Sequence, residues 1–165
     1  MVYDTMPTPV GELLLTANEA GLTGVYFEPH TLERDAHPEW RPVATAIGAA
    51  SAVLAAAREQ LEAYFAGART TFALPLAPRG TPFQQRVWTA LRSIDFGGTI
   101  SYAELAHRIG MPRAVRAVGG ANARNPLPII VPCHRVIGAD GSLTGFGGGI
   151  ERKRWLLRHE GALLA

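Results

Sequence analysis

The chain has 165 residues, of which 47% are hydrophobic and 18% are charged, and its formal net charge is +2. This length suits one domain of ordinary size or two small ones, and it allows roughly two-thirds of the unfolded surface to be buried without a metal or disulfide. The composition is that of a globular protein and excludes a disordered or fibrous chain.

The sequence does not indicate a membrane protein or a secreted protein. No stretch approaches the roughly 18 uninterrupted apolar residues of a membrane span, and the first four residues lack the basic-then-apolar order of a signal peptide. The single cysteine cannot form an internal disulfide or a cysteine-based zinc cage. We therefore expect a cytoplasmic protein.

The first half of the chain predicts a small α/β lobe. Residues 11–17 and 21–27 are predicted as two strands joined by a turn. Residues 28–42 are polar and predict an exposed connection. From residue 44 to residue 65 the chain is rich in alanine and other good helix formers, and Gly67 follows as a stop signal, so this stretch predicts one long helix.

A domain boundary is predicted at residues 74–80, because two prolines and a glycine there exclude a helix. Residues 1–77 carry 4 arginines and 9 acidic residues, a net charge of −5. Residues 78–165 carry 11 arginines, one lysine and 5 acidic residues, a net charge of +7. This asymmetry is typical of a nucleic-acid-binding protein whose second lobe stays away from the phosphates, although many basic domains bind nothing anionic.

The second half predicts a helix-turn-helix. Thr81 begins a helix with a capping box and a proline at the first helical position. A second capping box at Ser101 begins the next helix, which Gly110 ends. Pro112 opens a third, short helix that extends to Val118 and is broken by the two glycines that follow. Two short helices joined by a glycine-containing turn are typical of a helix-turn-helix, but they also occur as plain packing units.

The third helix is a poor reader of the major groove. Such a reader offers Asn, Gln, Arg or Ser to base edges, whereas residues 113–121 are mostly small and apolar, with two arginines. Small residues let a helix backbone approach the narrow minor groove, and Arg116 could then enter the space left by an unstacked base. In the alternative interpretation, the alanines and valines belong to the core and both arginines are solvated.

The only cysteine, Cys133, lies in the most informative stretch, residues 125–136. A lone cysteine beside branched apolar residues is usually an inert buried thiol. His134 and Arg135 instead favour the nucleophilic thiolate. Adjacent side chains on a strand point to opposite faces, so either the chain turns into a helix at Cys133 or a water relays the proton to His134. An acidic residue would have to fix the tautomer of His134, and the spacing does not identify it.

The stretch Pro132-Cys133-His134-Arg135-Val136 resembles the active-site signature of the O6-alkylguanine-DNA alkyltransferases, also called methylated-DNA–protein-cysteine methyltransferases. The resemblance covers nearly all of residues 80–165, with matches at 80–88, 101–102, 116–119, 125–126 and 156–161. It implies an α+β fold in which a small ribonuclease H-like α/β lobe, residues 1–77, precedes a mainly helical domain with a winged helix-turn-helix. In that second domain, residues 78–165, DNA binding and alkyl transfer would take place.

The resemblance implies DNA repair in a single turnover. The damaged guanine is flipped out of the duplex, and the cysteine takes its O6-alkyl group by direct displacement to form a stable thioether. O4-alkylthymine is a further candidate substrate. The expected partner is double-stranded DNA containing O6-alkylguanine, bound by a monomer that uses no cofactor and no membrane; cooperative assembly on DNA is left open.

The resemblance also assigns roles to individual residues. Cys133 matches the alkyl acceptor, His134 the base that removes the thiol proton through a water, and Glu160 the acid that orients this base. Asn125 resembles the residue that holds the turn around the site, and Tyr102 the tyrosine that hydrogen-bonds the flipped guanine. The expected DNA contacts are the finger Arg116, which replaces the flipped base, with Arg113, Ala114, Val115, Ala117 and Gly119, and the expected base pocket comprises Val136, Phe146, Gly147 and Gly148.

The chain departs from some members of this family. Gly147 stands in place of a serine and Phe146 in place of a tyrosine, which changes a hydroxyl contact and the expected pocket size. Some members bind zinc in the first domain, but this chain lacks the cysteines for it. His30 and His37 alone are a poor ligand set, so we expect no metal.

Three other functions remain open from the sequence. The chain could be an alkyltransferase-like protein that flips and flags damaged guanine without reacting, although Cys133 argues against this. It could be a cysteine hydrolase that uses Cys133, His134 and Glu160, although no oxyanion loop is recognisable. It could be a transcriptional regulator, for which the small-residue helix is poorly suited.

Overall fold

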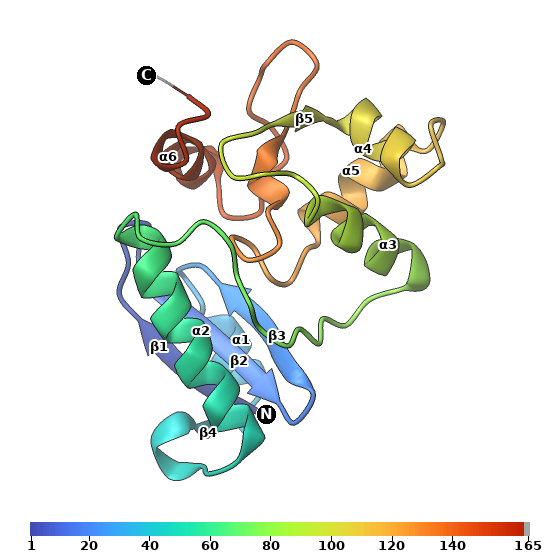
Figure 1. The fold of residues 1–165 in the computed structure, drawn as a ribbon. Coiled ribbons are helices and arrows are strands. Elements are labelled where there is room, and N and C mark those ends of the chain that lie inside the picture. The colour runs from blue at the N-terminus through green and yellow to red at the C-terminus, as the bar shows by residue number, and fades with distance from the viewer. Residues whose placement is uncertain (164–165) are drawn as a thin grey trace. The chain divides into compact units, whose positions relative to one another are not determined.

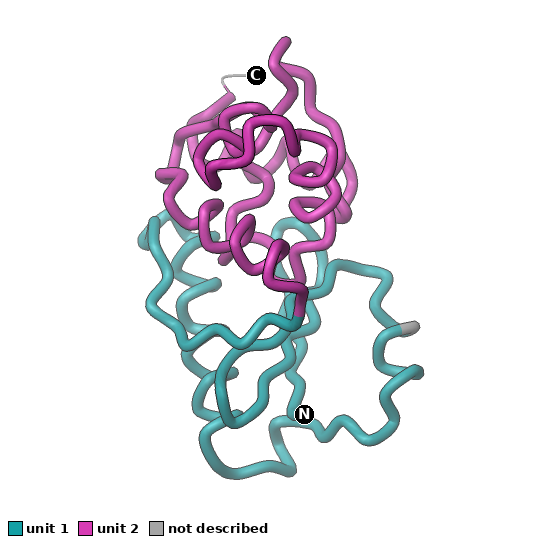
Figure 2. Tube along the Cα trace, turned by 90° about the vertical axis from the view of Figure 1, so that its right-hand side faces the viewer, with its two compact units in different colours: residues 1–79 teal, residues 80–165 magenta. Residues whose placement is uncertain are grey.

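The computed structural model describes residues 1–163 and has a mixed α+β fold. The chain divides into two compact units, residues 1–79 and residues 80–165, which Figure 2 shows in different colours. Each unit has its own set of buried hydrophobic side chains. Within the described residues, no helix combines the length and the apolar character needed to cross a membrane.

Unit 1 is built on a four-stranded sheet with strand order β3-β2-β1-β4. The strands are β1 (Val2–Met6), β2 (Leu13–Asn18), β3 (Gly21–Tyr26) and β4 (Arg41–Pro42). β2 is antiparallel to β1 and β3, and β4 is parallel to β1. The turn from β2 to β3 is closed by Asn18, whose Oδ1 accepts hydrogen bonds from the backbone N–H groups of Ala20 and Gly21. This use of the side chain is a reason why asparagine favours turns.

The long helix α2 (Ala49–Phe65) runs across one face of this sheet (Figure 1). Its buried residues recur every three or four positions, so they form one apolar face that packs against β1, β2 and β3. β2 is buried from Leu13 to Ala17, and it forms the centre of the core of unit 1. The hydroxyl groups of Thr16 and Thr23 satisfy each other inside this core, with 2.7 Å between their oxygens.

Unit 1 differs from the sequence prediction in three places. β1 has no clear hydrophobic alternation and is not predicted. The sequence predicts an exposed connection over residues 28–42, but the helix α1 (Thr31–Ala36) and β4 lie there, and Trp40 is buried. The long helix begins at Ala49 rather than at residue 44, because the 3-10 turn η1 (Val43–Thr45) precedes it and Gly48 has a left-handed φ of 131°.

Unit 2 is mainly helical. Its α-helices are α3 (Pro82–Leu91), α4 (Tyr102–Arg108), α5 (Val115–Ala123) and α6 (Ile150–His159), and the short 3-10 helix η2 spans Cys133–Arg135. The two-residue strands β5 (Ile100–Ser101) and β6 (Val136–Ile137) pair in parallel. α3, α4 and α5 pack against one another, and η2 packs against α3 and α6. This packing places the cysteine segment inside unit 2.

The helix starts of unit 2 follow from local hydrogen bonds. At α3 the predicted capping box is complete: Thr81 accepts from the N–H of Gln84 and Gln84 accepts from the N–H of Thr81. At α4 only half of the predicted box forms. Ser101 accepts from the N–H of Glu104, but the Glu104 side chain pairs with Arg108 instead of returning to Ser101.

The predicted bounds of the third helix of this half are wrong. α5 begins at Val115 rather than at Pro112, and it continues through Gly119 and Gly120 to Ala123. Glycine in a helix costs about 1 kcal/mol relative to alanine, and packing against α3 and α4 offsets this cost. A Cβ at Gly119 would lie 3.7 Å from the ring of Tyr102, an ordinary van der Waals contact, so close packing does not require a glycine there.

Candidate active site

The turn that leads to Cys133 is held by Asn125. The Nδ2 of Asn125 donates to the carbonyl of Val131 at 2.8 Å, and its Oδ1 accepts from the N–H of Leu127 at 3.0 Å. Between them, Ile129 has a φ of 75°, a conformation that a β-branched residue rarely adopts. Such strain persists only where neighbouring interactions fix the backbone, and Asn125 supplies two of these interactions.

Cys133 begins η2, so the chain turns into a short helix at the cysteine rather than continuing as a strand. Its side chain is nearly buried, with 4% of the residue exposed. Burial raises the pKa of the thiol to about 11, although a hydrogen bond from Asn125 and the positive charge of Lys153 act to lower it. Burial thus opposes the thiolate that His134 and Arg135 are expected to favour, so a base has to remove the proton of the thiol.

A buried carboxylate connects the two residues after the cysteine. Glu160 follows directly after α6, and its Oε2 lies 2.8 Å from Nε2 of His134. The same carboxylate accepts from Nε of Arg135 at 2.7 Å and from its second terminal nitrogen at 3.1 Å. Arg135 also donates to the carbonyl of Ile94 at 2.6 Å. The negative charge of Glu160 is thus buried but fully paired, which is the condition for keeping it ionised.

This arrangement fixes the tautomer of His134. The ionised carboxylate at Nε2 requires a proton on that nitrogen, which leaves the lone pair on Nδ1. Nδ1 is buried and makes no hydrogen bond to any residue that the structure describes. Burial lowers the pKa of His134, and the hydrogen bond and charge of Glu160 only partly oppose this. His134, the residue after the cysteine, is therefore a neutral imidazole whose Nδ1 can act as a base.

Tyr102 and Lys153 meet at one backbone carbonyl. The hydroxyl of Tyr102, at the start of α4, donates to the carbonyl of Thr144 at 2.9 Å. The ammonium of Lys153, on α6, donates to the same carbonyl at 2.8 Å and to the carbonyl of Val136 at 2.6 Å. Burial raises the pKa of Tyr102, so its hydroxyl stays a donor, and burial lowers the pKa of Lys153 to about 8.

Sequence reasoning does not identify Lys153 as a site residue. It lies among charged residues of α6, and its neighbours Arg152 and Arg154 are partly exposed, yet Lys153 itself is fully buried. One signal in the sequence could have marked it. The chain has 15 arginines and a single lysine, and that lysine is Lys153.

The predicted DNA contacts gather at the start of α5. Arg113, Arg116 and Ala117 are exposed, whereas Ala114, Val115 and Gly119 are half-buried. The alternative, in which the alanines and valines are core residues and both arginines are solvated, holds only in part: Val118 is buried and both arginines are exposed, but Ala117 is exposed as well. A hollow of about 460 Å³ lies at the turn before α5, lined by Met111, Pro112, Arg113 and Ala114.

The predicted base-pocket residues lie on the segment that connects η2 to α6. Val136 is buried in β6, Phe146 and Gly148 are half-buried, and Gly147 is exposed. Lys153 connects this segment to β6, because it binds the carbonyls of both Val136 and Thr144. The structure thus places Tyr102, Val136 and Lys153 in one hydrogen-bonded group.

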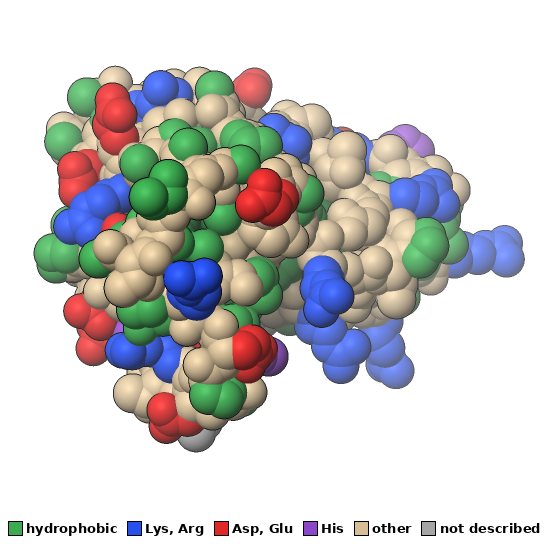
Figure 3. Space-filling view, turned by 90° about the horizontal axis from the view of Figure 1, so that it is seen from below, with side chains coloured by type: hydrophobic (Ala, Val, Ile, Leu, Met, Phe, Trp, Pro, Cys, Tyr) green, Lys and Arg blue, Asp and Glu red, His purple; other side chains and the backbone are tan. Residues whose placement is uncertain are grey.

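The surface of unit 2 is rich in cations. Figure 3 shows Lys and Arg side chains gathered on the right-hand part of the surface, where α3, α4 and α5 lie in Figure 1. The exposed arginines of these helices and their flanking turns are Arg86, Arg92, Arg108, Arg113, Arg116 and Arg124. Such a surface suits a phosphate backbone.

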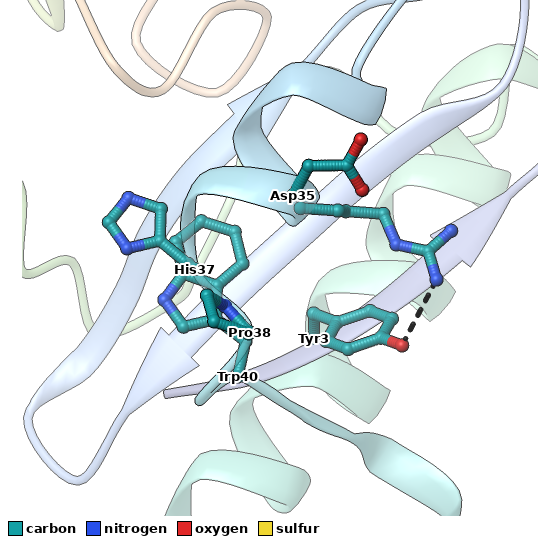
Figure 4. A pocket seen from close by; sticks show the side chains of 6 residues that line it. Tyr3, Asp35, His37, Pro38 and Trp40 are labelled. Atoms are coloured by element: carbon teal, nitrogen blue, oxygen red, sulfur yellow. Dashed lines mark hydrogen bonds between the residues drawn. The ribbon is translucent and has the colours of Figure 1, made fainter.

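Unit 1 has a small polar hollow of about 200 Å³ (Figure 4). Arg34 lies over the ring of Tyr3 and donates to its hydroxyl at 3.3 Å. His37 stacks on Trp40, with 4.4 Å between ring centres, and lies 3.1 Å from Glu39, whereas His30 faces Glu12. The two histidines thus have different partners, and no three His, Cys, Asp or Glu side chains of the described residues are arranged to hold a metal.

Two family models together match nearly the whole chain. The model described as the ribonuclease-like domain of 6-O-methylguanine DNA methyltransferase matches residues 1–78. The model described as the DNA binding domain of the same protein matches residues 82–162.

Known proteins match over a similar length. The methylated-DNA–protein-cysteine methyltransferase of Mycobacterium tuberculosis is 50% identical over 158 residues, which cover 96% of this chain and 91% of that protein. The constitutive enzyme of that name from Bacillus subtilis is 47% identical and covers 96% of this chain and 94% of its own length. A crystal structure of Mycobacterium tuberculosis OGT in complex with DNA has a TM-score of 0.85 and 48% identity, and covers 98% of this chain and 94% of that one.

Proposed function

The chain belongs to the 6-O-methylguanine DNA methyltransferase family, and from this premise we propose that it repairs DNA by transferring the alkyl group of O6-alkylguanine to Cys133. One observation carries the proposal. The chain's only cysteine lies next to a neutral histidine whose second nitrogen is held by a buried, ionised carboxylate. A nucleophile, a base and an orienting acid are the parts that such a displacement needs.

The first step of the proposed reaction is the removal of the proton from the Cys133 thiol. His134 takes it at Nδ1 through a water, and the resulting imidazolium is stabilised by Glu160 at Nε2. Because Arg135 pairs with the same carboxylate, Glu160 accepts from the imidazolium without being protonated itself. The sulfur then attacks the alkyl carbon, the S–C bond forms as the C–O bond breaks, and the electron pair leaves with the guanine oxygen.

The departing guanine requires stabilisation, because it leaves as an anion. The hydroxyl of Tyr102 is the proposed donor to the flipped base, and it reaches the base by leaving the carbonyl of Thr144. The base lies against Val136 and the segment with Phe146, Gly147 and Gly148. Gly147 offers a backbone N–H but no hydroxyl. The thioether product has no route of cleavage, so each protein molecule acts once.

Binding to the duplex is the proposed role of residues 78–165. The start of α5 offers small side chains that let its backbone approach the minor groove, and Arg116 fills the position of the flipped base. The exposed arginines contact phosphates independently of base sequence. The protein acts as a monomer in this scheme. O4-alkylthymine presents a similar O-alkyl carbon and is a second proposed substrate.

Mass spectrometry after incubation with duplex DNA containing O6-methylguanine tests this function. We expect one methyl group on Cys133, at most one per chain, and none in Cys133→Ala. His159→Ala is a control, because this half-buried histidine stacks on Trp155 at the end of α6 and has no assigned role. Repeated turnover by one protein molecule, or transfer in Cys133→Ala, contradicts the proposal, and DNA binding without any transfer favours the non-reacting flagging protein.

A further inference from the structure

Asn122 is a buried polar residue to which the proposed reaction assigns no role. It is the last residue but one of α5, and only 1% of it is exposed. The last turn of α5 is fixed by Trp88 of α3, whose indole N–H donates to the carbonyl of Ala121 at 2.9 Å. The backbone that carries the Asn122 side chain is therefore held in place by packing between the two helices.

The Asn122 amide lies against the peptide group that joins the proposed nucleophile to the proposed base. Its Nδ2 donates to the carbonyl of Cys133 at 3.4 Å, and this carbonyl belongs to the peptide between Cys133 and His134. Because a carbonyl only accepts hydrogen bonds, the amide nitrogen has to face it. The amide oxygen, Oδ1, is then left for another donor.

Two buried acceptors of unit 2 have no hydrogen-bond partner among the residues that the structure describes. They are Oδ1 of Asn122 and Nδ1 of His134. A buried acceptor without a donor is unfavourable, and an apolar side chain of similar size at position 122 would avoid one of the two. A purely structural role therefore does not explain the amide. Two acceptors cannot bond to each other, but a water, which has two hydrogens to donate, satisfies both.

We propose that Asn122 is a positioning residue that orients the water through which His134 takes the thiol proton. The water donates one hydrogen to Nδ1 of His134 and the other to Oδ1 of Asn122, so its oxygen accepts from the thiol of Cys133. A buried water makes about three hydrogen bonds, and these groups supply them. The thiol proton passes to the water as the water's hydrogen at Nδ1 passes to His134, so the water is regenerated. The inference rests on the proposed function in taking Cys133 as the nucleophile and His134 as its base.

Nuclear magnetic resonance of the two ring nitrogens of His134 tests this placement in the full chain without DNA. Their signals are identified by their absence in His134→Gln. In Asn122→Leu the water loses one of its acceptors, so we expect the Nδ1 signal to move toward that of a nitrogen without a hydrogen bond. The Nε2 signal should stay, because Glu160 still holds that nitrogen, at 2.8 Å. A merely structural defect moves both signals.

Further variants and a rate measurement complete the test. Ala123→Leu adds a leucine at the exposed next position of α5 and should leave both nitrogen signals unchanged. Circular dichroism confirms folding, and if Asn122→Leu does not fold, Asn122→Met decides by the same criterion. In the folded variant, the reaction with free O6-benzylguanine, which needs no base flipping, should slow about tenfold, because removal of the thiol proton by the base is impaired.

A crystal structure of the wild-type protein should show one water within hydrogen-bond distance of Oδ1 of Asn122, Nδ1 of His134 and Sγ of Cys133. A water at Nδ1 that does not contact Asn122, an unchanged Nδ1 signal in the folded variant, or a wild-type rate in that variant overturns the inference. Neither the crystal structure nor the nitrogen signals involve an alkylated base. Failure here therefore leaves the proposed repair reaction standing, and failure of methyl transfer in the wild-type protein leaves the position of the water standing.

Discussion

The Glu160 carboxylate accepts hydrogen bonds from two buried side chains at once. We therefore expect its replacement to lower the free energy of unfolding more than replacement of any other residue of the site. The carboxylate accepts from His134 on one oxygen and from Arg135 on both. Any neutral replacement leaves the guanidinium of Arg135 buried without an anion. It also removes the charge that stabilises the imidazolium of His134.

Glu160→Gln should therefore lower both stability and activity. We expect a loss of about 3–5 kcal/mol in the free energy of unfolding, the usual effect of breaking a buried ion pair, measured by urea denaturation. The single-turnover transfer rate should fall by roughly a hundredfold or more, since general-base catalysis loses its support. Glu151→Gln is the matched control, because Glu151 forms a largely exposed pair with Arg154 on the same helix. If both variants behave alike, the buried pairing has no special role.

The pKa of His134 gives a second prediction at this scale. Burial holds this pKa below its usual 6.5, so the imidazole stays a neutral base in mildly acid solution, where a free histidine is half protonated. The transfer rate should stay level from neutral pH to below pH 6.5. The folded state binds fewer protons at His134 than the unfolded state does, so this residue's contribution to stability decreases as the pH falls below 6.5. A rate that halves at pH 6.5 contradicts the assignment of His134 as the buried base.

Single residues were predictable where a short motif carries the chemistry. The sequence alone marks Cys133 and His134, but spacing alone does not identify Glu160, which is 26 residues from His134 and is brought there by α6. Lys153 was not predicted because it lies among charged residues of α6, and only its being the single lysine of the chain sets it apart from its arginine neighbours. Only the packing of α6 against η2 decides that this side chain is the buried one.

Among the helices and strands, α5 has the sequence and the exposure that its proposed role, contact with the DNA minor groove, requires. Its small residues are exposed or half-buried at its start, and Arg116 projects from its first turn. We expect Arg116→Ala to slow repair of duplex DNA by at least about tenfold, because the flipped state loses the side chain that fills the space left by the base. Reaction with free O6-benzylguanine, which needs no flipping, should change little.

The control for Arg116 is Arg158→Ala, which removes an exposed arginine from α6. It should slow neither reaction by more than a small factor. Equal losses on duplex DNA and on the free base in Arg116→Ala contradict the finger role, since the defect would then lie in the site itself.

Element boundaries were predictable where capping residues mark them and not where packing sets them. Thr81 and Gly110 mark a start and an end that the structure reproduces. α5 continues through two glycines because α3 and α4 support it, and local propensity contains no information about that support. The two-residue strands β5 and β6 have no sequence signal, since they exist only through their pairing with each other.

For the whole molecule, the separation of charge has a measurable consequence. The second half carries a net charge of +7, and its exposed arginines should contact several phosphates. Repair of duplex DNA should weaken steeply with salt, with log affinity falling by about 0.9 per phosphate contact for each unit of log salt. Reaction with free O6-benzylguanine serves as the internal control and should be nearly insensitive to salt. Parallel salt dependence of the two reactions contradicts phosphate contacts as the cause.

The carbonyl of Thr144 is shared by Tyr102 and Lys153, and this sharing has a consequence for the proposed base flipping. When the tyrosine hydroxyl turns to an incoming base in the proposed mechanism, the carbonyl keeps the lysine as its donor. In the proposed mechanism, inspection of a flipped base would therefore be a reversible exchange of the tyrosine's hydrogen-bond acceptor, which suits the single-turnover reaction proposed above.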